Sequence, residues 1–287
     1  MFSSILLIIP YFGKFNNFFP FFLESCKSNS SINWLIVTDD RTKYNYPPNI
    51  KVIYMTFDQL KNKIEDCFPF KISLEKPYKL CDYKPAYGMI FKEEIQGYDF
   101  WGYCDNDLIF GDIRSFLTEE ILKGREKVLS RGHLSLYRNN PRMNLFFQTS
   151  TNNFYKTVYT NPNGFSFDEW GKVGIANHLK RELNEDEFWD GLPFDDLLTT
   201  SSNFKPAQKL DKGYLNSLYL YDNGQLTRFY QTKATGKAIL TESVLYVHFQ
   251  KRPLKIETQD TERFMIIPNK IITPVEIDTD VIKIGGG

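Results

Sequence analysis

Short apolar runs recur along the first part of the chain, and each ends at a polar or turn-forming residue. The first three runs are residues 5–9, 34–38 and 52–55. Continuous apolar runs of this length are typical of strands buried on both faces of a parallel sheet. The pattern also predicts a helix at residues 18–28, between the first two runs. The chain therefore opens as strand, helix, strand and strand, which favours an α/β fold.

Two of the predicted strands end in acidic residues. A fourth apolar run, residues 98–104, leads directly into the triplet at 105–107, and the second run ends at Asp39 and Asp40. Ligands of open α/β sheets bind at the carboxyl ends of the strands, so these acidic ends should face one crevice if their strands share a parallel sheet. The remaining predicted segments are strands at 127–130 and 243–249, a helix-like segment at 86–95, and helical or loop-rich sequence at 138–225.

Composition argues against several classes of protein. The 287 residues carry 35 Lys and Arg against 35 Asp and Glu, so no net field attracts nucleic acid, and no such partner is expected. The four cysteines stand apart without a C-x-x-C pair, which argues against a zinc knuckle and favours a reducing, cytoplasmic compartment. Residues 5–10 are too short for a membrane span and lack the basic start of a signal peptide.

Four phenylalanines crowd into residues 18–22, which could form either a membrane-surface patch or part of the core. Burial in the core is the favoured interpretation, because large apolar side chains are usually inside a folded protein.

Asp105 and Asp107 are the strongest candidates for chemistry. Two carboxylates at a strand end can both reach one hard divalent cation, which in turn can bridge phosphate oxygens of a nucleoside diphosphate. An Asp-x-Asp alone is also common in solvated turns. Here the triplet follows an aromatic strand, and the mostly apolar residues 108–113 return the chain to the core at once. This context favours a metal site over a solvated loop.

Residues 103–112 resemble the metal-binding segment of GT-A glycosyltransferases, and residues 79–88 and 132–139 resemble two further blocks of a bacterial group within that class. This group is found in capsule and lipopolysaccharide gene clusters, and the similarity covers residues 5–252. The resemblance implies an α/β fold of the GT-A, Rossmann-like type, with a mostly parallel central sheet and helices on both faces. It also implies a UDP-sugar donor and Mn²⁺ or Mg²⁺ as the cofactor.

Metal ligands follow from the same resemblance. In glycogenin-like GT-A enzymes a histidine late in the domain joins the Asp-x-Asp on the metal, and His248 is placed to join Asp105 and Asp107. The alternative is a histidine satisfied within the core. Lys251, followed by Arg252, could neutralise the diphosphate. The chain departs from the family in lacking a His-x-x-Gly-x-x-Lys block.

Further donor contacts are implied for six residues. Asp39 or Asp40 resembles the carboxylate that contacts uridine or ribose, and Tyr11 lies where GT-A folds touch the base; an ordinary Asp turn is the alternative. By family analogy a block just before residue 86 helps line the donor pocket, although its last lysine could equally be a surface cation. The residues of this block are Lys79, Asp82 and Lys84.

An inverting transferase needs a carboxylate general base, whereas a retaining one needs no obvious base. Asp168 and Glu169 are the best candidates, because an acidic pair flanked by Phe167 and Trp170 suits a sugar platform. A helix N-terminus is the alternative reading of this pair. The weaker candidates are the run 185–190 and the pair Asp195 and Asp196. His133 could bind sugar hydroxyls or make a structural hydrogen bond.

A single catalytic domain is expected over residues 1–284. Its nucleotide-sugar part is placed at about 1–125, its acceptor and catalytic part at about 126–255, and a C-terminal extension at 256–284. The terminal glycines 285–287 are low-complexity sequence and are excluded from the prediction.

The sequence thus predicts a UDP-hexose-dependent transferase that extends a bacterial surface glycan (capsule, lipopolysaccharide O-chain or exopolysaccharide). It is expected to work in the cytoplasm at the inner membrane face, docked on the membrane surface, with a glycan acceptor that could be lipid-linked. Donor sugar, stereochemistry and oligomeric state stay open. One alternative is a carbohydrate-binding protein whose aromatic residues form stacking platforms. The other is a sugar nucleotidyltransferase, although the Gly-rich phosphate loop usual in that class is missing.

Overall fold

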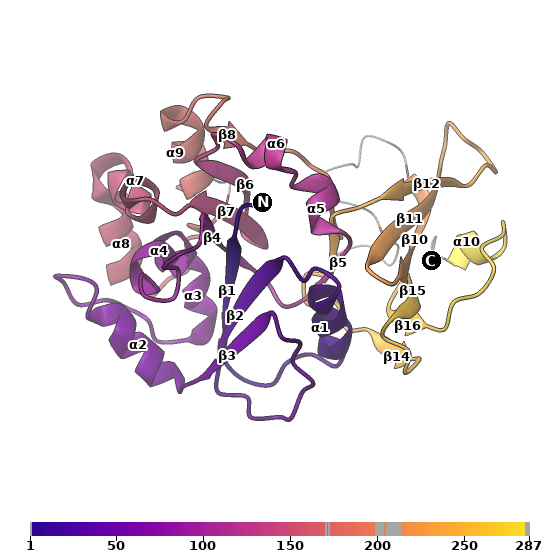
Figure 1. The fold of residues 1–287 in the computed structure, drawn as a ribbon, viewed down its shortest axis with the longest axis horizontal. Coiled ribbons are helices and arrows are strands. Elements are labelled where there is room, and N and C mark those ends of the chain that lie inside the picture. Colours follow the sequence, from indigo (N-terminus) through magenta and orange to yellow (C-terminus); the bar gives the residue numbers. More distant parts are fainter. Residues whose placement is uncertain (1, 170, 172, 199–203, 205–213, 285–287) are drawn as a thin grey trace.

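A seven-stranded sheet forms the centre of the protein in the computed structural model, which describes residues 2–169, 171, 173–198, 204 and 214–284 (Figure 1). Its strand order is β3-β2-β1-β4-β7-β6-β8. The strands are β1 (Ile5–Tyr11), β2 (Ile32–Thr38), β3 (Ile50–Tyr54), β4 (Phe100–Cys104), β6 (Lys127–Arg131), β7 (Leu134–Arg138) and β8 (Phe188–Trp189). β7 is antiparallel to both of its neighbours, and the other four pairs are parallel. The predicted α/β class and the four parallel strands that begin the sheet are confirmed.

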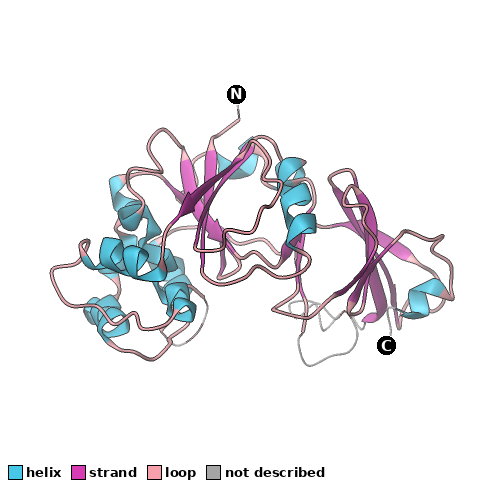
Figure 2. Cartoon of the chain, turned by 90° about the horizontal axis from the view of Figure 1, so that it is seen from below, coloured by secondary structure: helices cyan, strands magenta, loops and turns pink. Residues whose placement is uncertain are grey.

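Helices cover both faces of this sheet (Figures 1 and 2). One face carries α2 (Phe57–Glu65), α3 (Leu80–Tyr83), α4 (Tyr87–Ile90), α7 (Pro141–Asn144), α8 (Phe154–Thr160) and α9 (Ile175–Glu182), and the other carries α1 (Phe19–Lys27), α5 (Ile113–Phe116) and α6 (Glu119–Leu122). Because side chains alternate along a strand, Leu6 and Ile8 of β1 pack in the first core and Leu7 and Ile9 in the second. The apolar run needed to fill both cores is the pattern seen in the sequence.

The aromatic cluster at residues 18–22 is part of the core, as predicted. Phe19 and Phe22 are fully buried against the seven-stranded sheet. Phe18 and Phe21 point the other way and make edge contacts with Phe249 and Phe264. Helix α1 is therefore packed between the central sheet and the C-terminal part of the chain.

A second sheet of six strands lies beside α1, in the order β12-β11-β10-β15-β16-β14. Its strands are β10 (Tyr214–Asp222), β11 (Gln225–Thr232), β12 (Leu240–Ser243), β14 (Lys255–Glu257), β15 (Arg263–Ile267) and β16 (Lys270–Ile272), and helix α10 (Val281–Ile284) packs on it. The prediction of helical or loop-rich sequence up to residue 225 is wrong for β10. Asn223 and Gly224, both with positive φ, connect β10 to β11, and this Asn-Gly hairpin signal was overlooked.

A small third sheet joins the other two. It contains β5 (Leu108–Phe110), β13 (Tyr246–His248) and β9 (Asp195–Asp196), with β13 in the middle. The single strand predicted at 243–249 is in fact split between β12 and β13, which belong to different sheets. The predicted helix at 86–95 is also shorter, because α4 ends at Ile90 and turns follow. Strand β13 pairs His248 with both Leu108 and Asp196.

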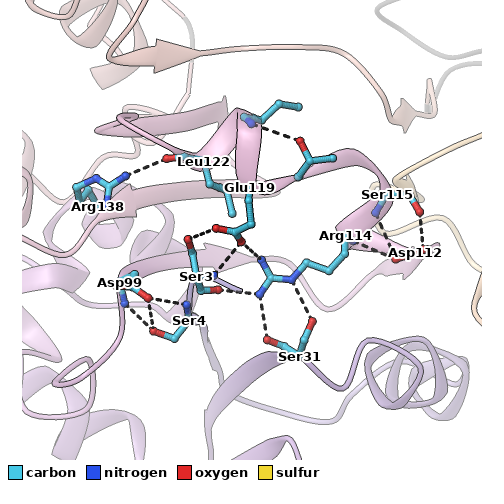
Figure 3. Close-up of polar contacts among 12 residues, drawn as sticks. Ser3, Ser4, Ser31, Asp99, Asp112, Arg114, Ser115, Glu119, Leu122 and Arg138 are labelled. Carbon is cyan, nitrogen blue, oxygen red and sulfur yellow. Dashed lines mark hydrogen bonds and ion pairs between the residues drawn. The ribbon is translucent and has the colours of Figure 1, made fainter. Parts of the chain in front are cut away.

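Polar side chains fasten the amino-terminal edge of the central sheet (Figure 3). Arg114 donates to the carbonyl of Ser3 at 2.8 Å and to Ser31, while Glu119 accepts from the Ser3 amide at 2.8 Å. Asp99 accepts from the Ser4 amide at 2.7 Å. These contacts lie at the edge opposite Asp105, so one edge of the sheet is closed by internal bonds and the other carries the acidic strand ends.

None of the helices in the described part of the chain combines the length and the apolar character that crossing a bilayer requires.

Candidate metal and active site

The acidic triplet forms a tight connection between β4 and β5 at the carboxyl edge of the central sheet. The amide of Asp105 donates to the carbonyl of His133 at 3.1 Å, and the amide of Phe249 donates to the carbonyl of Asp107 at 3.1 Å. Asp107 is buried and Asp105 is half-buried. The connection is therefore held from both sides by backbone bonds, which leaves the two carboxylates to project from a rigid support.

His248 lies beside these carboxylates, and its expected role as a third metal ligand stays a prediction. Its Nε2 lies 3.4 Å from Oδ1 of Asp107 and 4.0 Å from Oδ2 of Asp105. Burial opposes the charged imidazole, but hydrogen bonds to Asp107 and Asp196 outweigh it and raise the pKa of His248 to about 10. All three ligand atoms lie within 4.8 Å of one another. Cis ligands of a hard cation at about 2.1 Å lie about 3.0 Å apart, so the trio needs only small movements to close around one ion.

Asp196 supports His248 from the opposite side of the ring. Its Oδ1 lies 2.8 Å from Nδ1 of His248 and accepts a hydrogen bond from Nε2 of Gln250 at 2.5 Å. A carboxylate on one imidazole nitrogen orients the other nitrogen toward a metal, and this arrangement is common in metal sites. The sequence analysis considered Asp196 only as a weak candidate base. Nothing in the local pattern marks it, because β9 is two residues long and meets β13 only in the tertiary structure.

The turn after β13 wraps around Asp107. Gln250 and Lys251 both have positive φ, at 49° and 63°, a conformation that costs about 1–2 kcal/mol for each residue other than glycine. The amide of Lys251 donates to Oδ2 of Asp107 at 2.7 Å. Its ammonium lies 4.0 Å from the centre of the exposed Tyr78 ring. Lys251 therefore lies beside the Asp105–Asp107 connection, within reach of a phosphate group bound there.

Lys84 provides the buried positive charge of the site. Its Nζ lies 2.7 Å from Oδ1 of Asp105, 2.8 Å from the carbonyl of Gly132 and 3.3 Å from Oδ2 of Asp168. Burial alone would lower the pKa of Lys84, but Asp105 and Asp168 raise it well above the ordinary value. Lys84 thus stays charged and links the metal-facing carboxylate to the predicted catalytic pair.

Asp168 and Glu169 lie against Gly132 but differ in environment. Asp168 is buried, and this burial, opposed by Lys84, raises its pKa to about 7. Glu169 is the exposed member, and partial desolvation raises its pKa as well. A Cβ on Gly132 would come within 2.5 Å of Glu169 and 2.7 Å of Asp168, so glycine is required for this approach. The predicted flanking Trp170 lies outside the described residues.

The acidic end of β2 is tied to the loop after β1. Asp40 accepts from Nζ of Lys14 at 2.7 Å and from the Phe15 amide at 3.2 Å, and Asp39 accepts from the Gly13 amide at 2.8 Å. Tyr11 lies between the two acidic strand ends. Burial raises its pKa first, and the charges of Asp107 and Asp40 raise it further. The expected convergence of both acidic ends on one edge is thus present, with Tyr11 between them.

Lys79 and Asp82 form a buried ion pair of 2.8 Å on the far side of Lys84. Lys79 also donates to the carbonyl of Val158 at 2.9 Å, and Asp82 accepts from the amides of Phe165 and Phe167. In the structure these two residues hold the segment that precedes Asp168. Their predicted contact with the donor stays a prediction.

Comparisons with known proteins place the chain in a family without an assigned activity. The sequence profile described as "Family of unknown function (DUF6625)" matches residues 7–274. No curated protein matches the chain.

Several solved structures are similar at low levels of identity. The galactosyltransferase LgtC in complex with donor and acceptor sugar analogs has a TM-score of 0.37 and 13% identity, and the match covers 69% of this chain and 76% of that chain. Mouse xyloside xylosyltransferase 1 has a TM-score of 0.39 and 12% identity, and the match covers 69% of this chain and 88% of that chain. The glycosyltransferase GlyE of Streptococcus pneumoniae TIGR4 has a TM-score of 0.36 and 13% identity, and the match covers 66% of this chain and 45% of that chain. Similarity at this level does not establish a shared activity, so the functional argument rests on the side chains of the site.

Proposed function

We propose that this chain, which belongs to the family of unknown function DUF6625, is a metal-dependent glycosyltransferase that uses a UDP-sugar. The observation that carries the proposal is the convergence of Asp105, Asp107 and Nε2 of His248 at the carboxyl end of parallel strand β4. Two carboxylates and one imidazole suit Mn²⁺ or Mg²⁺, and Asp196 supplies the orienting carboxylate behind the histidine. A divalent cation held there would offset the negative charge that develops on a leaving diphosphate.

The donor side of the site is assembled from the loops after β1, β2 and β13. Lys251 is proposed to swing from the Tyr78 ring onto the diphosphate, because its amide is already bonded to Asp107. Tyr11, with Asp39 and Asp40 behind it, is proposed to meet the nucleoside. The hydrogen bonds that Asp40 accepts from Lys14 and Thr42 would hold Asp40 in position before a ligand binds.

The acceptor side is proposed to use Glu169 as general base. Glu169 is exposed and partial burial raises its pKa, which makes its carboxylate a stronger base, whereas Asp168 is buried beneath it and bound to Lys84. Glu169 would take the proton of the acceptor hydroxyl while that oxygen attacks the sugar. Asp168 would position Lys84 and does not touch the substrate. This division of roles corresponds to an inverting transfer.

The biological setting is proposed from the resemblance of residues 79–88, 103–112 and 132–139 to bacterial enzymes of capsule and lipopolysaccharide clusters. It consists of hexose transfer to a growing surface glycan, at the cytoplasmic face of the membrane, with a lipid-linked acceptor. In this scheme residues 1–125 bind the nucleotide-sugar, residues 126–255 bind the acceptor and complete the site, and residues 256–284 form an extension.

Thermal unfolding with UDP, GDP and CMP, each with and without Mn²⁺, tests the proposal. UDP and Mn²⁺ together should stabilise the protein more than the sum of their separate effects. With UDP at 100 times its dissociation constant in the presence of Mn²⁺, the total stabilisation should be about 2.7 kcal/mol. For a chain of this size that is roughly 5 °C. Asp107→Asn should abolish the joint effect, while Asp186→Asn, an exposed carboxyl in the loop before β8, should retain it.

Three outcomes would contradict the proposal or move it to another class. Stabilisation by oligosaccharides without metal or nucleotide would favour the carbohydrate-binding alternative. Stabilisation by UDP and Mn²⁺ together, combined with release of inorganic pyrophosphate when the protein is given UTP and a sugar phosphate, would favour the nucleotidyltransferase alternative. UDP-sugar hydrolysis that continues at full rate in a chelator would remove the metal from the mechanism.

A further inference from the structure

His248 has a second set of potential metal ligands on the Nδ1 side of its ring. Oδ1 of Asp196 lies 2.8 Å from Nδ1, and the His133 ring lies 4.5 Å from the His248 ring, centre to centre. Nε2 of His133 is 4.0 Å from Oδ2 of Asp196. Within the part of the chain that the structure describes, one ligand atom each from His133, Asp196 and His248 falls within 4.8 Å of the other two. Neither His133 nor Nδ1 of His248 has a part in the proposed transfer as a metal ligand.

His133 is supported in the manner of a metal ligand. Its Nδ1 lies 2.8 Å from the hydroxyl of Tyr246, and Phe194 packs against both rings. When Nδ1–H donates to the Tyr246 oxygen, the lone pair of Nε2 points to Asp196. Phe194 and Tyr246 pack against the His133 ring and restrict its orientation.

We propose that His133, Asp196 and His248 form a second divalent-cation site, selective for Zn²⁺ or a similar nitrogen-preferring ion, which excludes the Mn²⁺ or Mg²⁺ site. A neutral imidazole binds one ion through one nitrogen and carries its proton on the other. When Nε2 binds an ion with Asp105 and Asp107, Nδ1–H donates to Asp196. When Nδ1 binds an ion with His133 and Asp196, Nε2–H donates to Asp107, which lies 3.4 Å away.

The two donor sets select different ions. Two carboxylates and one imidazole favour hard cations such as Mn²⁺ and Mg²⁺, whereas two imidazoles and one carboxylate are a common Zn²⁺ set. Ligand atoms of a tetrahedral zinc site lie about 3.3 Å apart. One ligand atom from each of the three residues already lies within 4.8 Å of the other two, so closing around an ion needs movements of at most about 1.5 Å. Gln250 donates to Oδ1 of Asp196, and Oδ2 of Asp196 lies 4.0 Å from Nε2 of His133.

The exclusion of Mn²⁺ or Mg²⁺ and its consequence for activity rest on the proposed function, whereas Zn²⁺ binding by His133, Asp196 and His248 does not. If the enzyme uses Mn²⁺, then Zn²⁺ at the second site withdraws His248 from Asp105 and Asp107. The chain would then be inhibited by Zn²⁺ without Zn²⁺ entering the catalytic position. Added Mn²⁺ would reverse the inhibition, because the two ions compete for one imidazole.

Equilibrium metal binding tests the site with three variants. Mn²⁺ is followed by electron paramagnetic resonance, and Zn²⁺ by competition with Co²⁺, whose visible absorption reports tetrahedral coordination. His133→Gln should weaken Zn²⁺ binding at least tenfold and change Mn²⁺ binding less than twofold. Asp105→Asn should do the reverse, and His248→Gln should weaken both. In the wild-type protein, one equivalent of Zn²⁺ should release one equivalent of Mn²⁺.

Tyr246→Phe is the second variant for the His133 arm, because it keeps the ring that packs on Phe194 and removes only the hydroxyl. It should weaken Zn²⁺ severalfold and leave Mn²⁺ unchanged. The inference is overturned if Zn²⁺ affinity is the same in His133→Gln and wild type, which would place Zn²⁺ on Asp105 and Asp107, or if both ions bind together. Failure of the wild-type protein to bind Mn²⁺ with UDP would instead overturn the proposed function.

Discussion

Asp195→Ala should lower the free energy of unfolding by about 3–5 kcal/mol, because it breaks a fully buried ion pair. Nη1 of Arg228 on β11 lies 2.8 Å from each oxygen of Asp195 on β9, and neither side chain is exposed. The hydroxyl of Tyr219 donates to the same carboxylate at 3.1 Å. This pair connects the six-stranded sheet to the small sheet that carries Asp196 and His248. Its loss should therefore loosen the support of the metal site as well.

The magnitude follows from burial. The Arg228 guanidinium keeps its ion pair with the partly exposed Glu242 but loses the carboxylate that shares its buried environment. Much of its desolvation cost is then uncompensated, and the Tyr219 hydroxyl loses an acceptor that is worth about 1 kcal/mol. Asp195→Asn keeps an acceptor oxygen and should cost less than the alanine variant. The matched control is Asp222→Ala, which removes a 3.2 Å ion pair with Arg263. The side chain of Asp222 is 44% exposed and that of Arg263 is 58% exposed. Exposed pairs of this kind contribute about 0–1 kcal/mol.

Urea unfolding followed by far-ultraviolet circular dichroism measures these differences, with the slope of the transition compared between variants. The order of stability should be wild type, Asp222→Ala, Asp195→Asn and Asp195→Ala. A cost below about 1 kcal/mol for Asp195→Ala, no larger than that of the exposed control, would show that the Arg228 pair does not hold the sheets together.

Two further predictions concern Asp168 and Glu169, the proposed catalytic pair. Gly132→Ala places a Cβ 2.5 Å from Glu169 and 2.7 Å from Asp168 and should push both carboxylates away. A displacement of about 1 Å should lower the transfer rate roughly 100-fold. Gly164→Ala is the control, because nothing lies within 4 Å of its Cβ, and an equal loss of rate in this variant would contradict the prediction. The raised pKa of Asp168, about 7 against an ordinary 3.8, makes the folded state hold a proton that the unfolded state releases. Its stabilising contribution is therefore complete below pH 3.8 and is lost as the pH rises to about 7, by at most about 1.4 kcal/mol per pH unit. Urea unfolding at pH 5 and pH 8, in a chelator, should show this loss in the wild type and not in Asp168→Asn, and parallel behaviour of the two would refute it.

The parallel strands β1 to β4 could be predicted from the sequence because most of their signal is local, whereas β7 and β8 of the same sheet were not predicted. A strand covered on both faces by helices is apolar at nearly every position, as β1 and β4 are and as β2 is between Asn33 and Thr38. The acidic ends of β2 and β4 follow at once in the chain. Parallel pairing then places Asp40 and Asp105 at the same edge of the sheet, with no further information needed.

The six-stranded sheet was missed for a different reason. Its strands alternate less clearly, and β10 follows a long stretch without a periodic pattern. The turn of Asn223 and Gly224 is a local signal that could have identified the first hairpin. The pairing of β10 with β15, far along the chain, has no such local mark.

The sequence by itself determined the parallel strands, the acidic ends of β2 and β4, and the burial of the phenylalanines in α1, because each depends on neighbouring residues. Only the tertiary structure decided which groups surround His248. Asp196 and His133 lie 52 and 115 positions away in the chain and reach it through pairing of β9 with β13 and through the connection after β6. Side-chain chemistry at a site depends on distances between such remote segments, and local patterns carry no information about them.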